Sequence, residues 1–537
     1  MTTTAPAPPR RRTVLPWLVG AAVLVTAAAR VAYLLSPVMQ FNADEATTGI
    51  MVRRILAGHG YVFYAGQDYG GALEQYLEAA VYAVTRLPQN PLTLRLPLVA
   101  LCCLTCLLVY RVGREVLGDL RRALVAAALY AVGPWFNVIG TVTSLGFYAA
   151  GQALGMVALW CALRADRGRW WLAGTGLAAG LGVWTAATAL YLLIPVLVWL
   201  LPVLRHDLRR WAALAGGFLV GLLPQLGSLL VHPVLPLPRD PAQSSTVLER
   251  LGHLFGPVLR QFAGVTYSHT EGGLPVPLQV LVVVGLAAAY VVAVVRRRGL
   301  VDFLRGRVDR RRPGDLLLAV PPVVAVLYAA SNATWYTGTP RYLVGLFPLL
   351  AIGLAALVPV RPWPVPAAVV AAAAALSVAF FPSIQARDTS AQYATLRQVA
   401  TQLAADGEDR VWAGYWTATP LQYAAGDRIT VATAVGVRRF PEAQAVVERA
   451  PRFVYVGSDL DGTAAVFRTA LDRRHVPYRA RRFAFLTVFD RLPPTADPII
   501  GALRHPRARP AVPAPTAGRA RGPTGPRDRP RRSPRRS

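Results

Sequence analysis

Long uninterrupted apolar blocks constrain this sequence more than any other feature. The blocks run for roughly 18 to 25 residues, about the length that an α-helix needs to cross a bilayer core of ~30 Å at 1.5 Å per residue. Apolar residues make up 54% of the 537 residues, only 16% are charged, and mean hydropathy is +0.39. Such a chain is too apolar for most soluble folds, so we predict a polytopic α-helical membrane protein.

About eleven segments are candidate membrane spans. The first follows a polar start and resembles a signal peptide, but it is longer than a typical signal core, so we expect it to be retained. The candidate spans are residues 14–35, 91–110, 122–140, 143–163, 170–186, 188–204, 211–231, 277–295, 315–330, 341–359 and 363–381.

The arginines predict the orientation of these spans. If the N-terminus is cytoplasmic, the cytoplasmic segments hold about 22 arginines, against about 9 in or near the outer loops, as the positive-inside rule expects. We therefore predict a multi-pass protein of the cell membrane with its N-terminus in the cytoplasm and its C-terminal part outside.

Composition divides the chain into parts. Alternating helix and strand signals between residues 391 and 492 predict a small extracytoplasmic α/β domain, and the Pro- and Arg-rich end is too polar to bury a core. The predicted parts are a cytoplasmic tail (1–13), a transmembrane domain (14–382) with a catalytic outer loop (36–90), the α/β domain (383–494) and a disordered tail (495–537).

The formal charge of +29 does not predict nucleic-acid binding. The sequence has no lysine, so all 57 basic residues are arginine. Uniform arginine use with abundant Ala, Gly and Pro is typical of a GC-rich genome, and the position of the charges matters more than their sum. The partner indicated by this composition is the lipid bilayer.

The outer loop of residues 36–90 contains an adjacent acidic pair, Asp44 and Glu45. The pair begins a helix-compatible stretch, 45–57, whose apolar spacing is that of a helix lying on the membrane surface. Acidic residues are also favoured at a helix start, so a capping role is the alternative.

A second helix-compatible stretch, residues 71–87, follows the aromatic turn YAGQDYGG, which includes Tyr69. It carries Glu74 and Glu78. We expect Glu78 to form a surface salt bridge, whereas Glu74 is equally compatible with a surface role and with a place in a site. The loop thus holds carboxylates at the outer membrane face.

Several short motifs resemble those of the GT-C glycosyltransferases. They are Arg30 near the end of the first span, the DEA of Asp44 to Ala46 with Gly49 after it, the LRLP of residues 94–97, and TPRYLVGLFPLL with Arg341 and Tyr342 at the outer mouth of a span. The resemblance is to the branch of protein O-mannosyltransferases and lipid A aminoarabinose transferases, and it covers residues 14–382.

This resemblance implies an inverting transferase that moves a sugar from a polyprenyl-phosphate donor to an extracytoplasmic glycan, lipid or protein. An acceptor hydroxyl is a poor nucleophile and needs a carboxylate to accept its proton. Asp44 is the candidate general base, with Glu45 beside it. The leaving group is an anionic phosphate, which needs positive charge and hydrogen-bond donors rather than a general acid. The candidates for contact with the donor are Arg341, Arg95, Arg30, Glu74, Tyr342 and Tyr69.

Structural roles are open for two of the arginines. Arg30 lies within an apolar span, where a charge either pairs inside the protein or reaches for the interface. Arg95 begins a span and could anchor at lipid headgroups.

Two other functions remain possible. A transporter or lipid flippase is one, although such proteins place charged or broken segments near mid-bilayer and these spans are clean at their centres. A scaffold subunit that keeps the GT-C fold without activity is the other.

The sequence predicts no cofactor. The resemblance implies chemistry without a metal, although Asp44, Glu45 and Glu74 could together hold a divalent ion. Asp459 and Asp461 form an Asp-x-Asp that we interpret as a turn. No Walker or dinucleotide-binding motif is present, so nothing supports ATP-driven transport.

Overall fold

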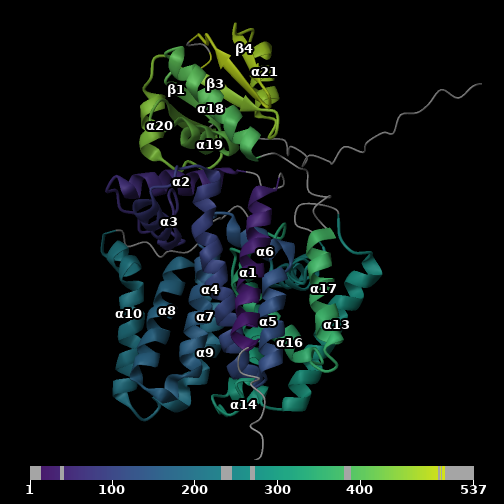
Figure 1. The fold of residues 1–537 in the computed structure, drawn as a ribbon. Coiled ribbons are helices and arrows are strands. Elements are labelled where there is room, and N and C mark those ends of the chain that lie inside the picture. Colours follow the sequence, from purple (N-terminus) through teal and green to yellow (C-terminus); the bar gives the residue numbers. More distant parts are fainter. Residues whose placement is uncertain are drawn as a thin grey trace, which may run out of the picture.

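A helical bundle with an α/β domain on one of its ends forms the molecule (Figure 1). The computed structural model describes residues 14–36, 41–231, 245–266, 272–334, 336–379, 389–493, 496 and 499–501. The end of the bundle opposite the domain contains α14 and the first residues of α1. We call the two ends the domain end and the α14 end. The predicted N-terminal tail and most of the predicted C-terminal tail lie outside the described residues.

The bundle consists of helices whose order follows the sequence-based expectation. Each of the predicted span ranges holds a helix or a pair of consecutive helices. The bounds are α1 Val14–Leu35, α2 Ala43–Leu56, α3 Leu73–Thr85, α4 Pro91–Leu117, α5 Leu120–Val132, α6 Trp135–Val142, α7 Tyr148–Leu163, η1 Ala165–Arg167, α8 Arg169–Thr185, η2 Ala187–Ala189, α9 Leu190–Leu204, α10 Leu208–Val231, α11 Val247–His253, η3 Leu254–Val258, α12 Leu259–Phe262, α13 Val276–Arg297, α14 Leu300–Leu304, α15 Gly314–Ala330, η4 Arg341–Leu346, α16 Phe347–Leu357 and α17 Pro364–Ala379.

Helix length and composition support a membrane protein. Among the described residues, five helical segments are long and apolar enough to cross a membrane, namely those within α1, α4, η2–α9, α10 and α13. α5 and α6 form a pair bent by 68° that adds a sixth, and α7, α15, η4–α16 and α17 are shorter apolar helices. The number of eleven spans stays a prediction.

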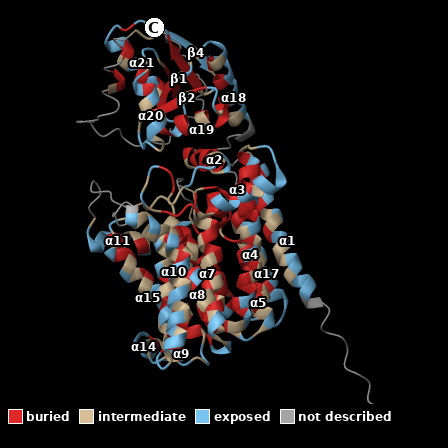
Figure 2. Cartoon of the chain, turned by 90° about the vertical axis from the view of Figure 1, so that its left-hand side faces the viewer, coloured by how far each residue is buried: buried red, intermediate tan, exposed pale blue. Residues whose placement is uncertain are grey.

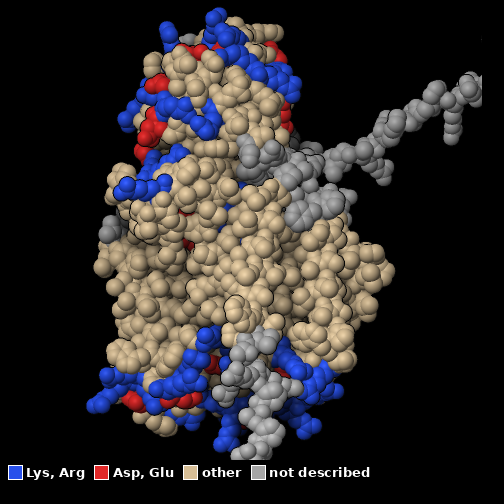
Figure 3. Space-filling view, in the orientation of Figure 1, with Lys and Arg blue, Asp and Glu red and all other residues tan. Residues whose placement is uncertain are grey.

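Charged side chains gather at the two ends of the molecule. Figure 3 shows arginine and acidic side chains at the α14 end and on the α/β domain, with a nearly uncharged band between them. A band without charges is the surface expected of a protein that faces lipid. Which end faces the cytoplasm stays a prediction from the arginine distribution.

The C-terminal domain is a five-stranded mixed sheet with helices on both faces, which confirms the predicted α/β character. The strand order is β2-β1-β3-β5-β4, with β1 parallel to β2 and β3, and β5 antiparallel to β3 and β4. The bounds are α18 Thr389–Ala405, β1 Arg410–Gly414, α19 Tyr415–Ala425, β2 Thr430–Val435, α20 Pro441–Glu448, β3 Val454–Ser458, α21 Thr463–Arg473, β4 Arg479–Phe483 and β5 Leu486–Asp490.

Alternate residues of the central strands fill two cores. Val411 and Ala413 pack with α18 and α19 on one face, whereas Trp412 packs with α20, α21 and Ile500 on the other. Side chains of a strand point alternately to its two faces, so an apolar strand such as VWAG serves both cores. α19 lies on the surface of the domain that faces the bundle.

α2 and α3 lie between the bundle and the C-terminal domain (Figure 2). Residues 43 and 45–52 of α2 are all buried. Phe41 and Ile50 pack against Tyr423 of α19. We expected the apolar side chains of α2 to face the membrane surface. That expectation is wrong, because α19 of the C-terminal domain, and not lipid, covers the helix.

Glycines bring α8 and α10 into backbone contact. Gly176 and Gly180 on α8 face Gly217 and Gly221 on α10, one helical turn apart on each helix. A Cβ added at any of the four would lie 2.0–2.4 Å from a backbone oxygen of the other helix. Small residues at this spacing allow the close approach typical of membrane helix pairs.

We expect Gly217→Leu to separate α10 from α8, because the new side chain meets backbone that cannot rotate away. Overpacking costs about 1–3 kcal/mol, so the unfolding temperature should fall. A thiol-reactive dye can follow unfolding through the free cysteines Cys102, Cys103, Cys106 and Cys161. Gly216→Leu is the matched control, since nothing lies within 4 Å of its added Cβ. Equal unfolding temperatures in the two variants would refute the backbone contact.

Candidate active site

Asn42 begins α2 and fixes the orientation of the acidic pair. Its side chain accepts a hydrogen bond of 3.0 Å from the Glu45 amide, so Asn42 is the helix cap. Asp44 and Glu45 occupy the first turn behind it, where the helix dipole favours negative charge. Because consecutive helical residues point about 100° apart, the two carboxylates meet different surroundings.

Glu45 forms a fully buried ion pair with Arg95 of α4. The Arg95 Nε and Nη2 atoms lie 2.7 and 2.6 Å from the two carboxylate oxygens, and the side chains are 1% and 0% exposed. The Ser144 amide donates a further bond of 3.2 Å. Removing one partner of such a pair leaves a buried charge and costs about 3–5 kcal/mol. The pair therefore fastens α2 to the top of α4.

Ser144 connects Glu45 to a second buried carboxyl. Its hydroxyl donates to Glu78 Oε1 over 2.6 Å, and its carbonyl accepts from Thr48 over 3.1 Å. Glu78 is fully buried, and among the described residues no ion pair includes it. The expected surface salt bridge of Glu78 is thus wrong. Burial raises the pKa of Glu78 well above its usual range, with Glu74 and Glu45 adding to the effect.

Glu74 caps the start of α7. Its Oε1 atom accepts a bond of 2.8 Å from the Ala150 amide, and the side chain is 1% exposed. Burial raises the pKa of Glu74 to about 7, and the bonds from Ala150 and Ala149 oppose that shift. Glu74 therefore supports the turn that carries Tyr148 rather than standing free in a site.

Asp44 faces the C-terminal domain and is the more accessible carboxylate. Its side chain is 33% exposed. The Oδ1 atom accepts hydrogen bonds from the Tyr415 hydroxyl and, over 3.1 Å, from Arg439 Nη2. Its backbone carbonyl accepts from the Tyr64 hydroxyl over 2.5 Å. Tyr415 and Arg439 were absent from the sequence-based candidates, since nothing in their motifs links them to residues almost 400 positions earlier.

Arg341 lies within a group of aromatic side chains close to Asp44. It begins η4, and its guanidinium carbon lies 5.5 and 5.7 Å from the ring centres of Tyr336 and Tyr342. The guanidinium also interacts electrostatically with Tyr148, Asp44 and Tyr69. Four of the predicted residues, Asp44, Arg341, Tyr342 and Tyr69, thus come together from three separate parts of the chain.

Arg30 belongs to a different environment. It is fully buried, its Nη1 donates to the Ala131 carbonyl over 3.0 Å, and its guanidinium lies 5.2 Å from the Tyr130 ring. Cys102 and Cys106 are its other neighbours, and none of these residues belongs to the group around Arg341. Arg30 therefore lies inside the bundle against a carbonyl and a tyrosine ring, and does not reach the interface.

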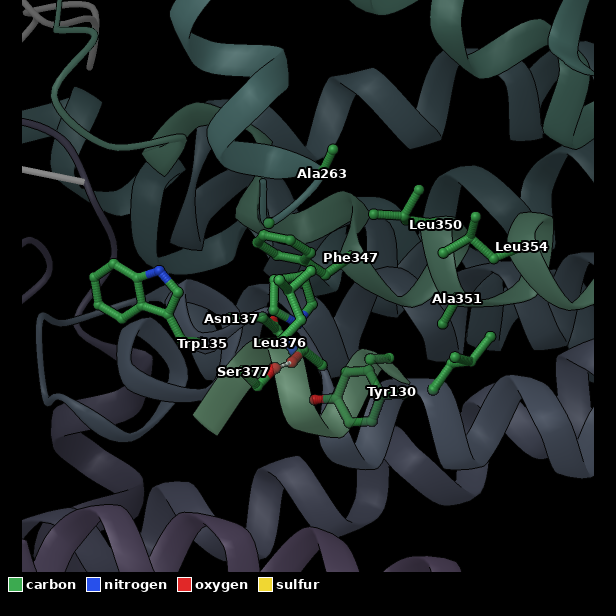
Figure 4. A pocket seen from close by; sticks show the side chains of 15 residues that line it. Tyr130, Trp135, Asn137, Ala263, Phe347, Leu350, Ala351, Leu354, Leu376 and Ser377 are labelled. Atoms are coloured by element: carbon green, nitrogen blue, oxygen red, sulfur yellow. Dashed lines mark hydrogen bonds between the residues drawn. The ribbon is translucent and has the colours of Figure 1, made fainter. Parts of the chain in front are cut away.

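A small apolar cavity lies where α5, α6, α16 and α17 meet (Figure 4). Its volume is about 90 Å³, and Tyr130, Asn137 and Ser377 supply its polar lining side chains, together with the Trp135 indole. Among the described residues that line it there is no carboxylate and no arginine, so they offer neither a carboxylate base nor a positive charge for a phosphate.

Two larger cavities lie between α2 and the C-terminal domain, with volumes of about 320 and 980 Å³. Arg439 lines the smaller one, and Arg397 and Arg428 line the larger one. Arg53 and Arg54 line both. Asp427 and Glu442 also line both cavities, and neither Asp44 nor Arg341 is among the described residues that line them.

The described residues contain no group of three or more side chains with the arrangement of a metal site. Asp459 and Asp461 lie in the turn before α21, where Asp461 accepts from the Thr463 amide over 3.0 Å. The interpretation of this Asp-x-Asp as a turn is confirmed.

Comparison with known proteins agrees with this arrangement. Residues 75–230, from α3 to α10, match the family described as dolichyl-phosphate-mannose-protein mannosyltransferase. The match covers less than a third of the chain. No curated protein shows significant sequence similarity.

Two crystal structures of ArnT from Cupriavidus metallidurans are similar over 88% of this chain and 97% of theirs. The apo structure has a TM-score of 0.58 at 14% identity, and the structure bound to undecaprenyl phosphate has 0.56 at 15%. The chain therefore has the fold of these ArnT structures, and part of it matches the mannosyltransferase family. The GT-C resemblance found in the sequence is confirmed, and the ArnT-like fold includes the C-terminal domain as well as the bundle.

We expect the stability of the protein to fall as pH rises, in part through Glu74. Its pKa is about 7 in the fold and near 4.5 when unfolded, so its contribution is full below pH 4.5 and is lost as pH rises through 7. At about 1.4 kcal/mol per pKa unit, the loss is about 3 kcal/mol.

Glu74→Gln should therefore show a smaller decrease of unfolding temperature between pH 4.5 and 8 than the wild type. Asp427→Asn is a control on an exposed carboxyl. A Glu74→Gln curve parallel to the wild type would contradict the buried, proton-binding Glu74.

Proposed function

We propose that the protein transfers a sugar from a polyprenyl-phosphate donor to an acceptor hydroxyl outside the cytoplasm, with inversion at the anomeric carbon. The observation that carries this proposal is the partly exposed Asp44 carboxylate together with the Arg341 guanidinium, which lies against the rings of Tyr336 and Tyr342 and interacts electrostatically with Asp44. The match of residues 75–230 to the mannosyltransferase family and the ArnT-like fold support a glycosyltransferase. The undecaprenyl phosphate bound to ArnT supports a lipid-phosphate donor.

Asp44 is the proposed general base. Among the described residues, none donates a hydrogen bond to its Oδ2 atom, whereas Oδ1 has two donors. Oδ2 takes the proton of the acceptor hydroxyl as that oxygen bonds to the anomeric carbon. The bond from the anomeric carbon to the phosphate oxygen breaks, and polyprenyl phosphate leaves with the electron pair.

Arg341 is the proposed partner of the leaving phosphate. Its guanidinium can donate two parallel hydrogen bonds to phosphate oxygens, where negative charge grows during the reaction. The tyrosines around it provide hydroxyl donors and flat apolar walls. We assign Glu45, Arg95 and Glu74 to the positioning of α2 and α7, because each is buried against protein.

Asp44→Asn should reduce turnover by about 10²–10⁴-fold, the usual contribution of a general base. The measurement is transfer of radiolabelled sugar from a panel of undecaprenyl-phosphate-linked hexoses and pentoses by protein in nanodiscs. Asp68→Asn is the matched control, because Asp68 is an exposed carboxylate in the same outer segment.

Binding of undecaprenyl phosphate should not change in Asp44→Asn, and its unfolding temperature should fall less than that of Glu45→Gln, because Asp44 is partly exposed. Glu45→Gln should lose both activity and stability, because Arg95 is then left buried without its counter-charge. Equal turnover in Asp44→Asn and wild type would refute the proposed base. Movement of lipid across the bilayer without sugar transfer would favour a flippase instead.

Arg341→Gln should weaken the binding of undecaprenyl phosphate by about tenfold or more, since a hydrogen bond to a charged group contributes about 1.5–3 kcal/mol. Affinity can be measured with a fluorescent undecaprenyl phosphate in nanodiscs. Arg361→Gln removes the same charge from an exposed position between α16 and α17 and should leave the affinity unchanged. The assignment fails if both variants bind like the wild type.

A further inference from the structure

The C-terminal domain touches the bundle through α2, the helix that carries Asp44. Tyr423 of α19 packs where Gly49 leaves room, since a Cβ at Gly49 would lie 2.4 Å from the Tyr423 ring. The Thr419 hydroxyl donates to the Ala43 carbonyl over 3.0 Å, and Arg53 donates to the Tyr423 carbonyl over 2.6 Å. These contacts fix the domain in one register on α2.

The loop between β2 and α20 inserts Arg439 beside Asp44. The Arg439 side chain is only 11% exposed. Its guanidinium donates to the Ala65 carbonyl over 3.3 Å and to Gln67 Oε1 over 3.1 Å, in addition to Asp44. Gly66, at a φ of +72°, lies directly against this loop, because a Cβ there would be 2.7 Å from the Arg439 Cα. Arg439 is thus held by Ala65 and Gln67 of the outer loop as well as by Asp44.

Tyr415, the first residue of α19, completes the arrangement. Its hydroxyl donates to Asp44 Oδ1 and accepts from Arg439 Nη2 over 3.1 Å. The two side chains together fix one carboxylate oxygen, and Oδ2 has no donor among the described residues. A carboxylate held by two partners at one oxygen cannot rotate freely about its side-chain bonds.

We infer that Arg439 and Tyr415 are positioning residues that hold Asp44 with Oδ2 toward the acceptor, so the C-terminal domain completes the active site. This inference rests on the proposed role of Asp44 as the base. Catalytic groups need their orientation fixed by surrounding hydrogen bonds, and a displacement of 1 Å can cost about 100-fold in rate. The domain contributes to turnover and not to the binding of the lipid donor, which Arg341 and the bundle tyrosines contact.

The test uses the full-length protein in nanodiscs with the same panel of undecaprenyl-phosphate-linked sugars. Arg439→Ala should lower kcat by about 10- to 100-fold, with KM for the donor and the affinity for undecaprenyl phosphate unchanged. Tyr415→Phe should lower kcat by a smaller factor, because Arg439 still holds Oδ1. Arg439→Lys keeps the charge without the planar fork and should recover part of the activity.

Arg438→Ala is the matched control, an exposed arginine in the same loop that should keep wild-type kinetics. Added methylguanidine should restore part of the turnover of Arg439→Ala, whereas a variant that has only lost its fold cannot be rescued in this way. No rescue in Arg439→Ala, or kinetics equal to those of Arg438→Ala, would overturn the inference.

Asp44→Asn separates this inference from the proposed function. If Asp44→Asn is inactive and Arg439→Ala is fully active, only the positioning role fails. If Asp44→Asn turns over like the wild type, the proposed base itself fails, and the positioning role fails with it.

Discussion

The buried ion pair of Glu45 and Arg95 is the interaction on which the arrangement of the site depends. It joins the first turn of α2 to the top of α4, with both side chains at most 1% exposed. Two charges are taken out of water only when they are well paired, and the loss of either partner is costly. Glu45 therefore fixes the height and rotation of α2, and with them the direction of the adjacent Asp44. Ser144, Glu78 and Glu74 extend the same buried layer to the start of α7.

Neighbouring carboxylates acquire separate roles through their surroundings. Glu45 is enclosed by the bundle and bound at both oxygens, whereas Asp44 is partly exposed and bound at one. The outer loop is thus a layer between the membrane helices and the α/β domain, fastened below through Glu45 and above through Asp44. This arrangement explains how a domain distant in sequence can reach a carboxylate next to the membrane part.

The sequence predicted the features that depend on the residues of one short segment. Blocks of apolar residues located the helices of the bundle, and the DEA motif and TPRYLVGLFPLL contain Asp44 and Arg341, which the fold places within electrostatic reach of one another. Burial by an element distant in sequence was not predictable. The sequence around Glu78 is typical of a surface residue, but in the fold Ser144 and α2 cover its side chain. Arg439 is one of 57 basic residues, and only the docking of α19 on α2 distinguishes it.

The most direct test of the central claim is a cryo-EM structure of the protein in nanodiscs with undecaprenyl phosphate bound. The account predicts the phosphate about 2.7–2.9 Å from the Arg341 guanidinium, among Tyr148 and Tyr342, with Asp44 Oδ2 facing the same space and Arg439 still on Oδ1. A phosphate bound at the α14 end, or at the domain end without contact to Arg341, would contradict it.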